Sequence, residues 1–181
     1  MTVRRKHLHW FECNRSDYRG PKAPTFFYEM PYGMFYGFPA VDDLGVKVAE
    51  HSGGEEEADP LTDSRLLEEP DLARVRDFVG EHLPLVGNAA RHTRHAACFY
   101  TMSPDEQFII DTHPSHKNVV FSAGLSGHGF KFTSVLGEIM ADLALNGSSP
   151  QPIGFLNAKR LFVNDKGSPP RSCPDFSGKS S

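Results

Sequence analysis

Short apolar stretches separated by turn residues open the chain and predict a series of strands. Residues 3–12 have β character and predict a first strand that begins close to the first residue. The aromatic segments 26–30 and 34–38 flank Pro31-Tyr-Gly33, a sequence typical of a hairpin turn. Residues 45–50 alternate apolar and polar positions and therefore predict the next strand.

The alternation in this last strand separates a lysine from its valine neighbours. Successive side chains of a strand point to opposite faces, so Lys47 and His51, four positions apart, share one side. Val46 and Val48 take the other side, where we expect the core. Two interpretations of Lys47 follow: it belongs to an exposed polar face, or it is a cation directed at a ligand.

An amphipathic helix is predicted after a long polar segment. Residues 52–70 are polar and acidic, and we expect them to form a solvated surface connection. Asp71 suits the N-terminal region of the helix that follows, and Pro84 ends it. The predicted buried face of this helix consists of five apolar residues at helical spacing: Leu72, Val75, Phe78, Val79 and Leu83.

The second half of the chain predicts another hairpin, a strand and a helix. Residues 96–102 and 107–111 predict a hairpin around Ser103-Pro-Asp-Glu106, where the proline favours a type I turn. Residues 119–123 are an apolar run and predict a strand. The helix after it ends at Asn146-Gly147, and its apolar face consists of Phe132, Leu136, Ile139, Met140 and Leu143. The predicted fold class is α+β, with a mostly antiparallel sheet, flanking helices and no internal repeats.

The sequence GLSGHGFKF, at residues 124–132, joins this last strand to its helix. Gly124, Gly127 and Gly129 leave backbone N–H groups free at the helix N-terminus, where a ligand can come close and the dipole favours an anion. Lys131 falls in the first turn of the predicted helix, where a cation is disfavoured. It therefore either needs a compensating anion or points into solvent. The glycine spacing matches neither the dinucleotide-binding G-x-G-x-x-G nor a Walker phosphate loop.

Composition narrows the class of protein. The chain has 181 residues, of which 39% are hydrophobic and 23% charged, as in a soluble globular domain. The net charge is −4 and no basic stripe dominates the sequence, so nothing indicates a nucleic-acid-binding protein. Three widely spaced cysteines predict neither a disulfide framework nor a metal site. No apolar run approaches the roughly 18 residues of a membrane span, and no targeting segment is recognisable, so we expect a cytoplasmic protein.

Aromatic residues and one cysteine leave further alternatives open. The fourteen phenylalanines and five tyrosines cluster around residues 26–28, 35–38 and 99–100. Such aromatic strands either fill a core or line an apolar pocket for a flat ligand. Cys98 lies among apolar neighbours, which is typical of an inert core thiol.

Three long segments together resemble a known family: MFYGFPAVDDLGVKVAEH, CFYTMSPDEQFIIDTHP and NVVFSAGLSGHGFKFTSVLGE. They are similar to the C-terminal half of monomeric sarcosine oxidase and N-methyltryptophan oxidase, a branch of the FAD-dependent amino-acid oxidase superfamily. The similarity covers residues 3–160 in order. It implies the antiparallel substrate-domain sheet of the family, together with the last strand and helix of its FAD domain.

The resemblance implies FAD as the cofactor. Cys98 matches the cysteine that carries the flavin through a thioether to its 8α-methyl group. The other cofactor-binding residues that the resemblance implies lie in the glycine-rich turn: Gly127, His128, Gly129 and Phe130.

The resemblance also implies substrate and catalytic residues. Lys131 matches the lysine that pairs with the substrate carboxylate. Tyr36 and His51 match the tyrosine and histidine around the substrate's amine and carboxylate. Lys47 matches the lysine over the flavin where oxygen is reduced, and its charge would contribute electrostatically. The implied reaction removes hydride from the carbon next to the secondary amine of an N-alkyl amino acid, giving an imine and hydrogen peroxide, with the hard step left to the cofactor.

The family's N-terminal half, with the Rossmann strand and its G-x-G-x-x-G, has no counterpart in this sequence. Three explanations are open, of which a shortened reading frame is favoured over a split enzyme with a partner chain and over a cut fragment. Residues 1–162 are then the substrate and catalytic part of the oxidase, and residues 163–181, rich in Gly, Ser and Pro, are a disordered tail.

We expect such a chain to be inactive alone, to bind FAD weakly and to associate through exposed aromatic residues around Tyr36 and Phe38. Two other functions compete with the oxidase. The first is a non-catalytic module that binds a small carboxylate through the glycine-rich turn and Lys47. The second is a subunit that completes a flavoenzyme together with a Rossmann-containing chain.

Overall fold

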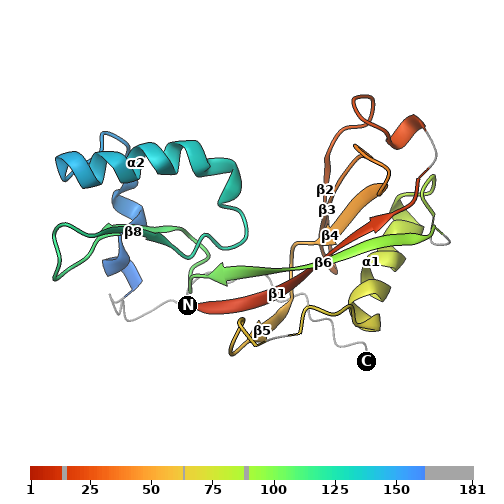
Figure 1. Ribbon diagram of the computed structural model, residues 1–181, viewed down its shortest axis with the longest axis horizontal. Coiled ribbons are helices and arrows are strands. Elements are labelled where there is room, and N and C mark those ends of the chain that lie inside the picture. Colours follow the sequence, from red (N-terminus) through yellow and green to blue (C-terminus); the bar gives the residue numbers. More distant parts are fainter. Residues whose placement is uncertain (14–15, 63, 88–89, 162–181) are drawn as a thin grey trace. The chain divides into compact units, whose positions relative to one another are not determined.

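The computed structural model describes residues 1–13, 16–62, 64–87 and 90–161, and it has the expected α+β fold with mostly antiparallel pairing (Figure 1). The chain divides into two compact units. Residues 5–99 form the first, which we call the sheet unit. Residues 1–4 and the described residues from 100 onward form the second, which we call the turn unit.

The sheet unit is built around a six-stranded sheet in the order β2-β3-β4-β1-β5, with β6 also paired to β1. These strands are β1 (Thr2–Phe11), β2 (Phe26–Met30), β3 (Gly33–Phe38), β4 (Val46–Glu50), β5 (Glu55–Glu57) and β6 (His92–Met102), and a 3₁₀ turn, η1 (Ser16–Tyr18), follows β1. The predicted hairpin is confirmed, because β2 pairs antiparallel with β3 in a register that ends at Met30 and Gly33.

Helix α1 (Glu69–His82) covers one face of this sheet. It begins with Pro70 in the first turn and acidic residues beside it, which suits the positive end of the helix dipole. The five residues of the predicted apolar face are all buried. Phe78 stacks on Phe35 of β3 with ring centroids 4.3 Å apart and planes 4° apart, so the helix and the sheet share one core.

The pairing predicted for β6 is wrong. The sequence predicted a hairpin between residues 96–102 and 107–111, but β6 pairs with β1, and β7 (Ile109–Thr112) pairs with β8 (Val120–Ala123) instead. The turn at residues 103–106 therefore connects two different sheets. An apolar strand pattern specifies a buried face and not a partner, so the error lies in the pairing and not in the strands themselves.

The described residues of the acidic connection, 52–62 and 64–70, do more than form a solvated surface. The connection contains β5, and its carboxylates surround the buried guanidinium of Arg5, which is 5% exposed. Glu55 and Glu57 each form an ion pair with Arg5, and Glu68 adds a third at 3.6 Å. A buried charge requires compensation, so these acids have a structural role and are not only solvated.

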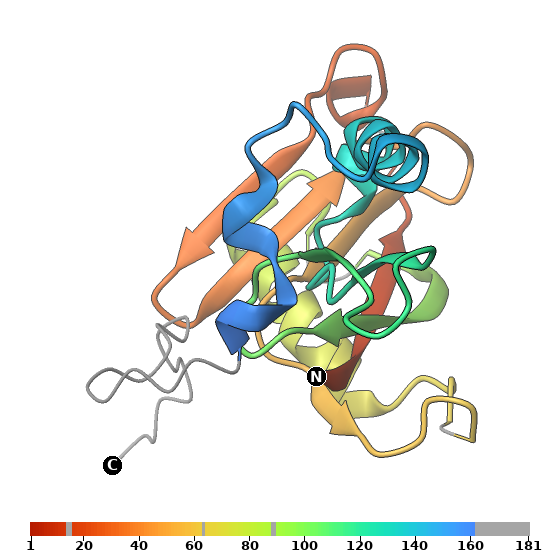
Figure 2. The same ribbon diagram turned by 90° about the vertical axis from the view of Figure 1, so that its left-hand side faces the viewer.

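The turn unit contains the β7–β8 pair, helix α2 (Thr133–Asn146) and three 3₁₀ turns, η2 (Phe130–Phe132), η3 (Ile153–Leu156) and η4 (Ala158–Leu161). Its core lies between the strand pair and α2, with Leu136 and Ile139 buried as predicted. Phe132 is an exception, since 39% of it is exposed. Turns η3 and η4 run beside β7 (Figure 2). Helix α2 ends as predicted at Gly147, whose φ of 73° suits a residue without a side chain.

Two further expectations concern the C-terminal tail and membrane spans. The predicted tail, residues 163–181, lies outside the described residues. Within the described part of the chain, no helix has both the length and the apolar character needed to cross a bilayer.

Candidate functional site

Lys47 lies on the face of the sheet opposite α1, between two aromatic rings. Its neighbours Val46 and Val48 are fully buried on the other face, as the alternation predicted. Trp10 on β1 and Phe38 on β3 are its register partners. The ammonium nitrogen lies 5.4 Å from the Trp10 ring centroid and 5.3 Å from that of Phe38. At these distances both rings attract the cation.

The electrostatic environment of Lys47 makes its charge costly. Burial lowers the pKa of the half-buried ammonium, while the Cys98 thiol acts on the same pKa in the opposite direction. Cys98 is free and half-buried on β6, and neither of the two hydrophobic cores of the described chain includes it. It therefore lies outside both cores, although its neighbours along the strand are apolar. The lysine and the cysteine instead interact in one part of the sheet unit.

Tyr36 and His51 lie together on the same side of the sheet unit. Their ring centroids are 6.2 Å apart in an edge-to-face arrangement, and Tyr36 is also 6.2 Å from the Phe38 ring. The backbone N–H of His51 donates to the Met34 carbonyl at 2.6 Å, which fixes the residue beyond the end of β4. Phe38 is 42% exposed, as expected for this face. The structure thus groups Tyr36, Lys47 and His51 around one aromatic surface.

The glycine-rich turn is tightly closed within the turn unit. Gly127 has a φ of 78°, and a Cβ at this position would lie 2.2 Å from the Tyr100 ring, so only glycine fits. Ser126 anchors the turn: its N–H donates to the Thr101 carbonyl at 3.0 Å, and its hydroxyl donates to the Gly124 carbonyl at 3.0 Å. The glycines therefore serve a specific close approach and not only flexibility.

The remaining predicted residues of the turn have distinct environments. His128 packs on the Phe108 ring at 4.7 Å, and its Nδ1 lies 3.0 Å from the Ser126 carbonyl oxygen. Lys131 lies in η2, one turn ahead of α2, so its predicted position in the first turn of the helix is wrong; an extra 3₁₀ turn precedes the α-helix. Lys131 is exposed, and no carboxylate of the described residues pairs with it.

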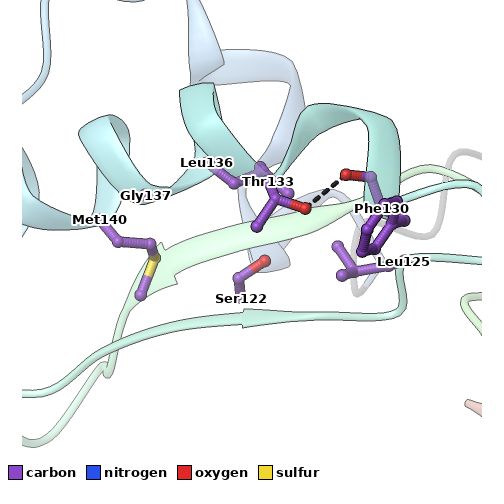
Figure 3. A pocket seen from close by; sticks show the side chains of 8 residues that line it. Ser122, Leu125, Phe130, Thr133, Leu136, Gly137 and Met140 are labelled. Carbon is purple, nitrogen blue, oxygen red and sulfur yellow. Dashed lines mark hydrogen bonds between the residues drawn. The ribbon is translucent and has the colours of Figure 1, made fainter.

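An open apolar groove of about 510 Å³ runs beside this turn, between β8 and α2 (Figure 3). Gly129 and Phe130, both predicted to bind the cofactor, line it from the turn. The Thr133 hydroxyl donates to the Phe130 carbonyl and holds the turn against α2. The Phe130 side chain is 94% exposed, which is unusual for an aromatic residue next to an apolar groove.

The predicted site residues thus fall into two groups, one in each unit. Tyr36, Lys47, His51 and Cys98 belong to the sheet unit, and residues 127–131 belong to the turn unit. The sequence patterns did not indicate that Trp10 is the partner of Lys47. They also did not indicate Arg94, whose guanidinium carbon lies 5.2 Å from the Trp10 ring centroid. The predicted strand over residues 3–12 contains Trp10, but the strand that lies next to it is decided by non-local pairing.

Comparison with known proteins adds relatives for most of the chain. Residues 1–143 match the family described as DAO, FAD dependent oxidoreductase. A monomeric sarcosine oxidase from Bacillus sp. (strain NS-129) is 38% identical over 159 residues, which cover 86% of this chain and 40% of that protein. An N-methyl-L-tryptophan oxidase from Salmonella enteritidis PT4 (strain P125109) is 42% identical over 151 residues, covering 80% of this chain and 38% of the relative.

Solved structures agree with the fold. L-proline dehydrogenase from P. horikoshii matches 89% of this chain and 40% of its own, with a TM-score of 0.72 and 20% identity. The deglycating enzyme fructosamine oxidase from Aspergillus fumigatus (Amadoriase II) matches 86% of this chain and 37% of its own, with a TM-score of 0.64 and 21% identity. At such identities the likeness shows the fold alone. The chain spans about two fifths of the length of the curated relatives it matches, and over that span it belongs to the family of FAD-dependent oxidoreductases.

Proposed function

We propose that this chain is the substrate and catalytic part of an FAD-dependent oxidase that acts on the C–N bond of a secondary amino acid. Its relatives are named for N-methylated amino acids, sarcosine and N-methyl-L-tryptophan. In the proposed reaction the C–N single bond of the substrate becomes a C=N double bond with the loss of two electrons and two protons. Dioxygen takes up two electrons and two protons and becomes hydrogen peroxide.

The observation that carries this proposal is the position of Lys47. A half-buried ammonium between two aromatic rings, close enough to a free thiol for Cys98 to influence its pKa, suits a planar cofactor with a sulfur attachment point. Neither Lys47 nor Cys98 belongs to the hydrophobic core of the sheet unit. Bound FAD would supply the group that accepts the substrate's hydride and that oxygen then reoxidises.

Each residue then has a defined task. Lys131, exposed and without a carboxylate partner among the described residues, binds the substrate carboxylate. Tyr36 and His51 orient the amine end of the substrate from the aromatic surface. Lys47 stabilises the negative charge that develops on dioxygen, an effect typically worth about 10²- to 10³-fold in rate for one well-placed group. The turn residues 127–130 provide close backbone approach, and Cys98 provides a thiolate for covalent attachment of the flavin.

The attachment is tested by mass spectrometry. The full chain is incubated with FAD, alone and together with the Rossmann-containing N-terminal segment of a monomeric sarcosine oxidase, and then digested. We expect the mass of FAD on the peptide that contains Cys98 when both segments are present, and little FAD with the chain alone. Cys98→Ser is the matched control, because it keeps the shape of the residue and removes the thiol. A free Cys98 thiol in the presence of both segments and excess FAD would contradict covalent attachment.

Catalysis is tested separately in the same reconstituted complex. With sarcosine as substrate, Lys131→Met should raise KM strongly, because the carboxylate loses its counter-ion. Lys47→Met should leave KM for the amine nearly unchanged and slow the reaction with oxygen. Equal effects of the two variants on both parameters would show that the two lysines do not have these separate roles.

The apolar groove favours a second function, that of a subunit which completes a flavoenzyme with another chain. The groove between β8 and α2 is open, and the adjacent Phe130 ring is 94% exposed. Among the described residues, β8 pairs on one side only, with β7. Co-purification of this chain with a Rossmann-containing protein from its own source would support the subunit, and Phe130→Ser should weaken that association. Purification without any such protein, and an unchanged association in Phe130→Ser, would argue against it.

A further inference from the structure

Four histidines of the sheet unit meet between β1 and β6, on the face of the sheet that α1 covers. His7 Nδ1 lies 2.7 Å from His95 Nε2, and His9 Nδ1 lies 3.2 Å from His92 Nε2. The His9 and His95 ring centroids are 5.6 Å apart, so the two pairs form one group. His9 shares the core face because its register partner is the fully buried Val48. We call these four residues the histidine cluster.

The cluster consists of a fully buried His9 and three half-buried rings, and it is only partly compensated. His9 is 0% exposed, and its Nε2 has no hydrogen-bond partner among the described residues. His7 Nε2 lies 3.1 Å from Asp71 Oδ2 of α1, and no hydrogen bond joins these two atoms. The other charged groups that act on the cluster come from β1 (Arg5), α1 (Arg76) and the acidic segment (Glu55 and Glu68).

The hydrogen-bond geometry of the two pairs requires at least one neutral ring in each pair. In each pair one ring nitrogen has to donate and the facing nitrogen has to accept. A fully protonated histidine can only donate, so two protonated rings would direct N–H groups at each other across about 3 Å. Each pair therefore accommodates at most one added proton. At His7 the Asp71 carboxylate favours that proton and Arg5 opposes it, while at His9 Arg76 opposes it.

We propose that the histidine cluster is an acid-sensitive latch that holds β6 on β1 while its imidazoles are neutral and releases the two strands when they are protonated. This inference does not depend on the oxidase proposal. It does connect to the candidate site, because β1 carries Trp10 directly after His9, and β6 carries Cys98 three residues after His95.

The direction of the pH dependence follows from the burial of the cluster. Burial lowers the pKa of His9 from 6.5 to about 3, and repulsion from the other histidines adds to the effect. Burial likewise lowers the pKa values of His7, His92 and His95. Below pH 6.5 these histidines bind protons in the unfolded chain but remain neutral in the folded chain. The folded state therefore loses stability as the pH falls. Between pH 8 and 4.5, His9 alone should lower the ratio of folded to unfolded chain about 100-fold, and the loss should level off near pH 3.

The latch is tested by urea unfolding of the full chain between pH 8 and pH 4.5. Trp10 is the only tryptophan of the chain, and it lies next to the cluster, so its fluorescence reports on β1 directly. We expect the unfolding equilibrium of the wild type to shift strongly toward the unfolded chain below pH 6.5. His9→Phe keeps a buried ring beside Phe11 and removes the titrating group, so about 100-fold of this shift should disappear. His82→Gln, at the end of α1 and outside the cluster, is the matched control and should keep the wild-type slope.

Equal pH slopes for the wild type and His9→Phe would overturn the proposal. A titration of the folded wild type by NMR, followed at the Cε1–H signals of the four histidines, gives an independent answer if His9→Phe does not fold. Midpoints well below 6.5, with loss of the β1 and β6 amide signals as the rings are protonated, support the latch. Midpoints at or above 6.5 in a chain that remains folded would refute it.

Discussion

Gly127→Ala tests why the glycine-rich turn requires a residue without a side chain at position 127. The new Cβ would lie 2.2 Å from the Tyr100 ring, far inside van der Waals contact, and the φ of 78° disfavours any side chain. A left-handed backbone costs alanine about 1–2 kcal/mol, and forcing extra atoms into a packed region costs about 1–3 kcal/mol. We therefore expect the free energy of unfolding of the turn unit to fall by about 2–5 kcal/mol.

Gly137→Ala is the matched control for this substitution. Gly137 lies inside α2, and a Cβ there would meet no atom within 4 Å. The same chemical change should therefore stabilise the chain by about 0.5–1 kcal/mol, because alanine loses less backbone entropy in a helix. The double variant Gly127→Ala with Tyr100→Ala separates the two contributions. Without the ring, Gly127→Ala should cost only the backbone strain of about 1–2 kcal/mol.

Both effects can be measured by guanidinium unfolding followed by far-UV circular dichroism, with amide hydrogen exchange of α2 to assign the change to the turn unit. A Gly127→Ala variant within about 0.5 kcal/mol of the wild type, the usual range for a surface substitution, would refute the reasoning. So would an equal cost with and without the Tyr100 ring, since steric overlap could not then be a major part of the penalty.

Three further predictions concern other parts of the chain. Phe78→Ala removes a fully buried stacked ring and should lower the stability measured by thermal denaturation by about 3–5 kcal/mol. Phe130→Ala, at an exposed ring, should change the stability by less than about 0.5 kcal/mol. Equal costs for the two variants would contradict the assignment of Phe78 to the core. Hydrogen bonds from the Arg160 guanidinium lower the pKa of Asp105. This carboxylate therefore stabilises the fold above its unfolded pKa of about 3.8 and loses that contribution as the pH falls through its lower folded pKa. Asp105→Asn should be less stable than the wild type at pH 6 and should lack this loss at acid pH, and parallel curves of stability against pH for the two proteins would speak against the ion pair. Burial lowers the pKa of the Lys47 ammonium, so in an NMR titration of ¹³C-methylated lysines its signal should move at a lower pH than those of exposed lysines, and a midpoint at or above theirs would contradict the half-buried position.

The sequence alone determined the local elements of this protein. The hairpin around residues 31–33, the apolar face of α1 and the glycine that ends α2 follow from patterns within about a dozen residues. The face on which Lys47 lies also follows from a local pattern, because the two sides of a strand alternate residue by residue. The family resemblance rested on motifs of the same local kind, and it is confirmed.

Tertiary structure decided which strands are neighbours when they do not form a local hairpin, and with them every contact between distant segments. The strand pattern of β6 was visible in the sequence, but its partner is β1, which lies more than 80 residues away, and not the adjacent β7. That single pairing creates the histidine cluster and brings Arg94 onto the Trp10 ring. The physical reason is that periodicity records only whether a side chain is buried, while the choice of partner depends on the combined packing of both strands and the helix above them.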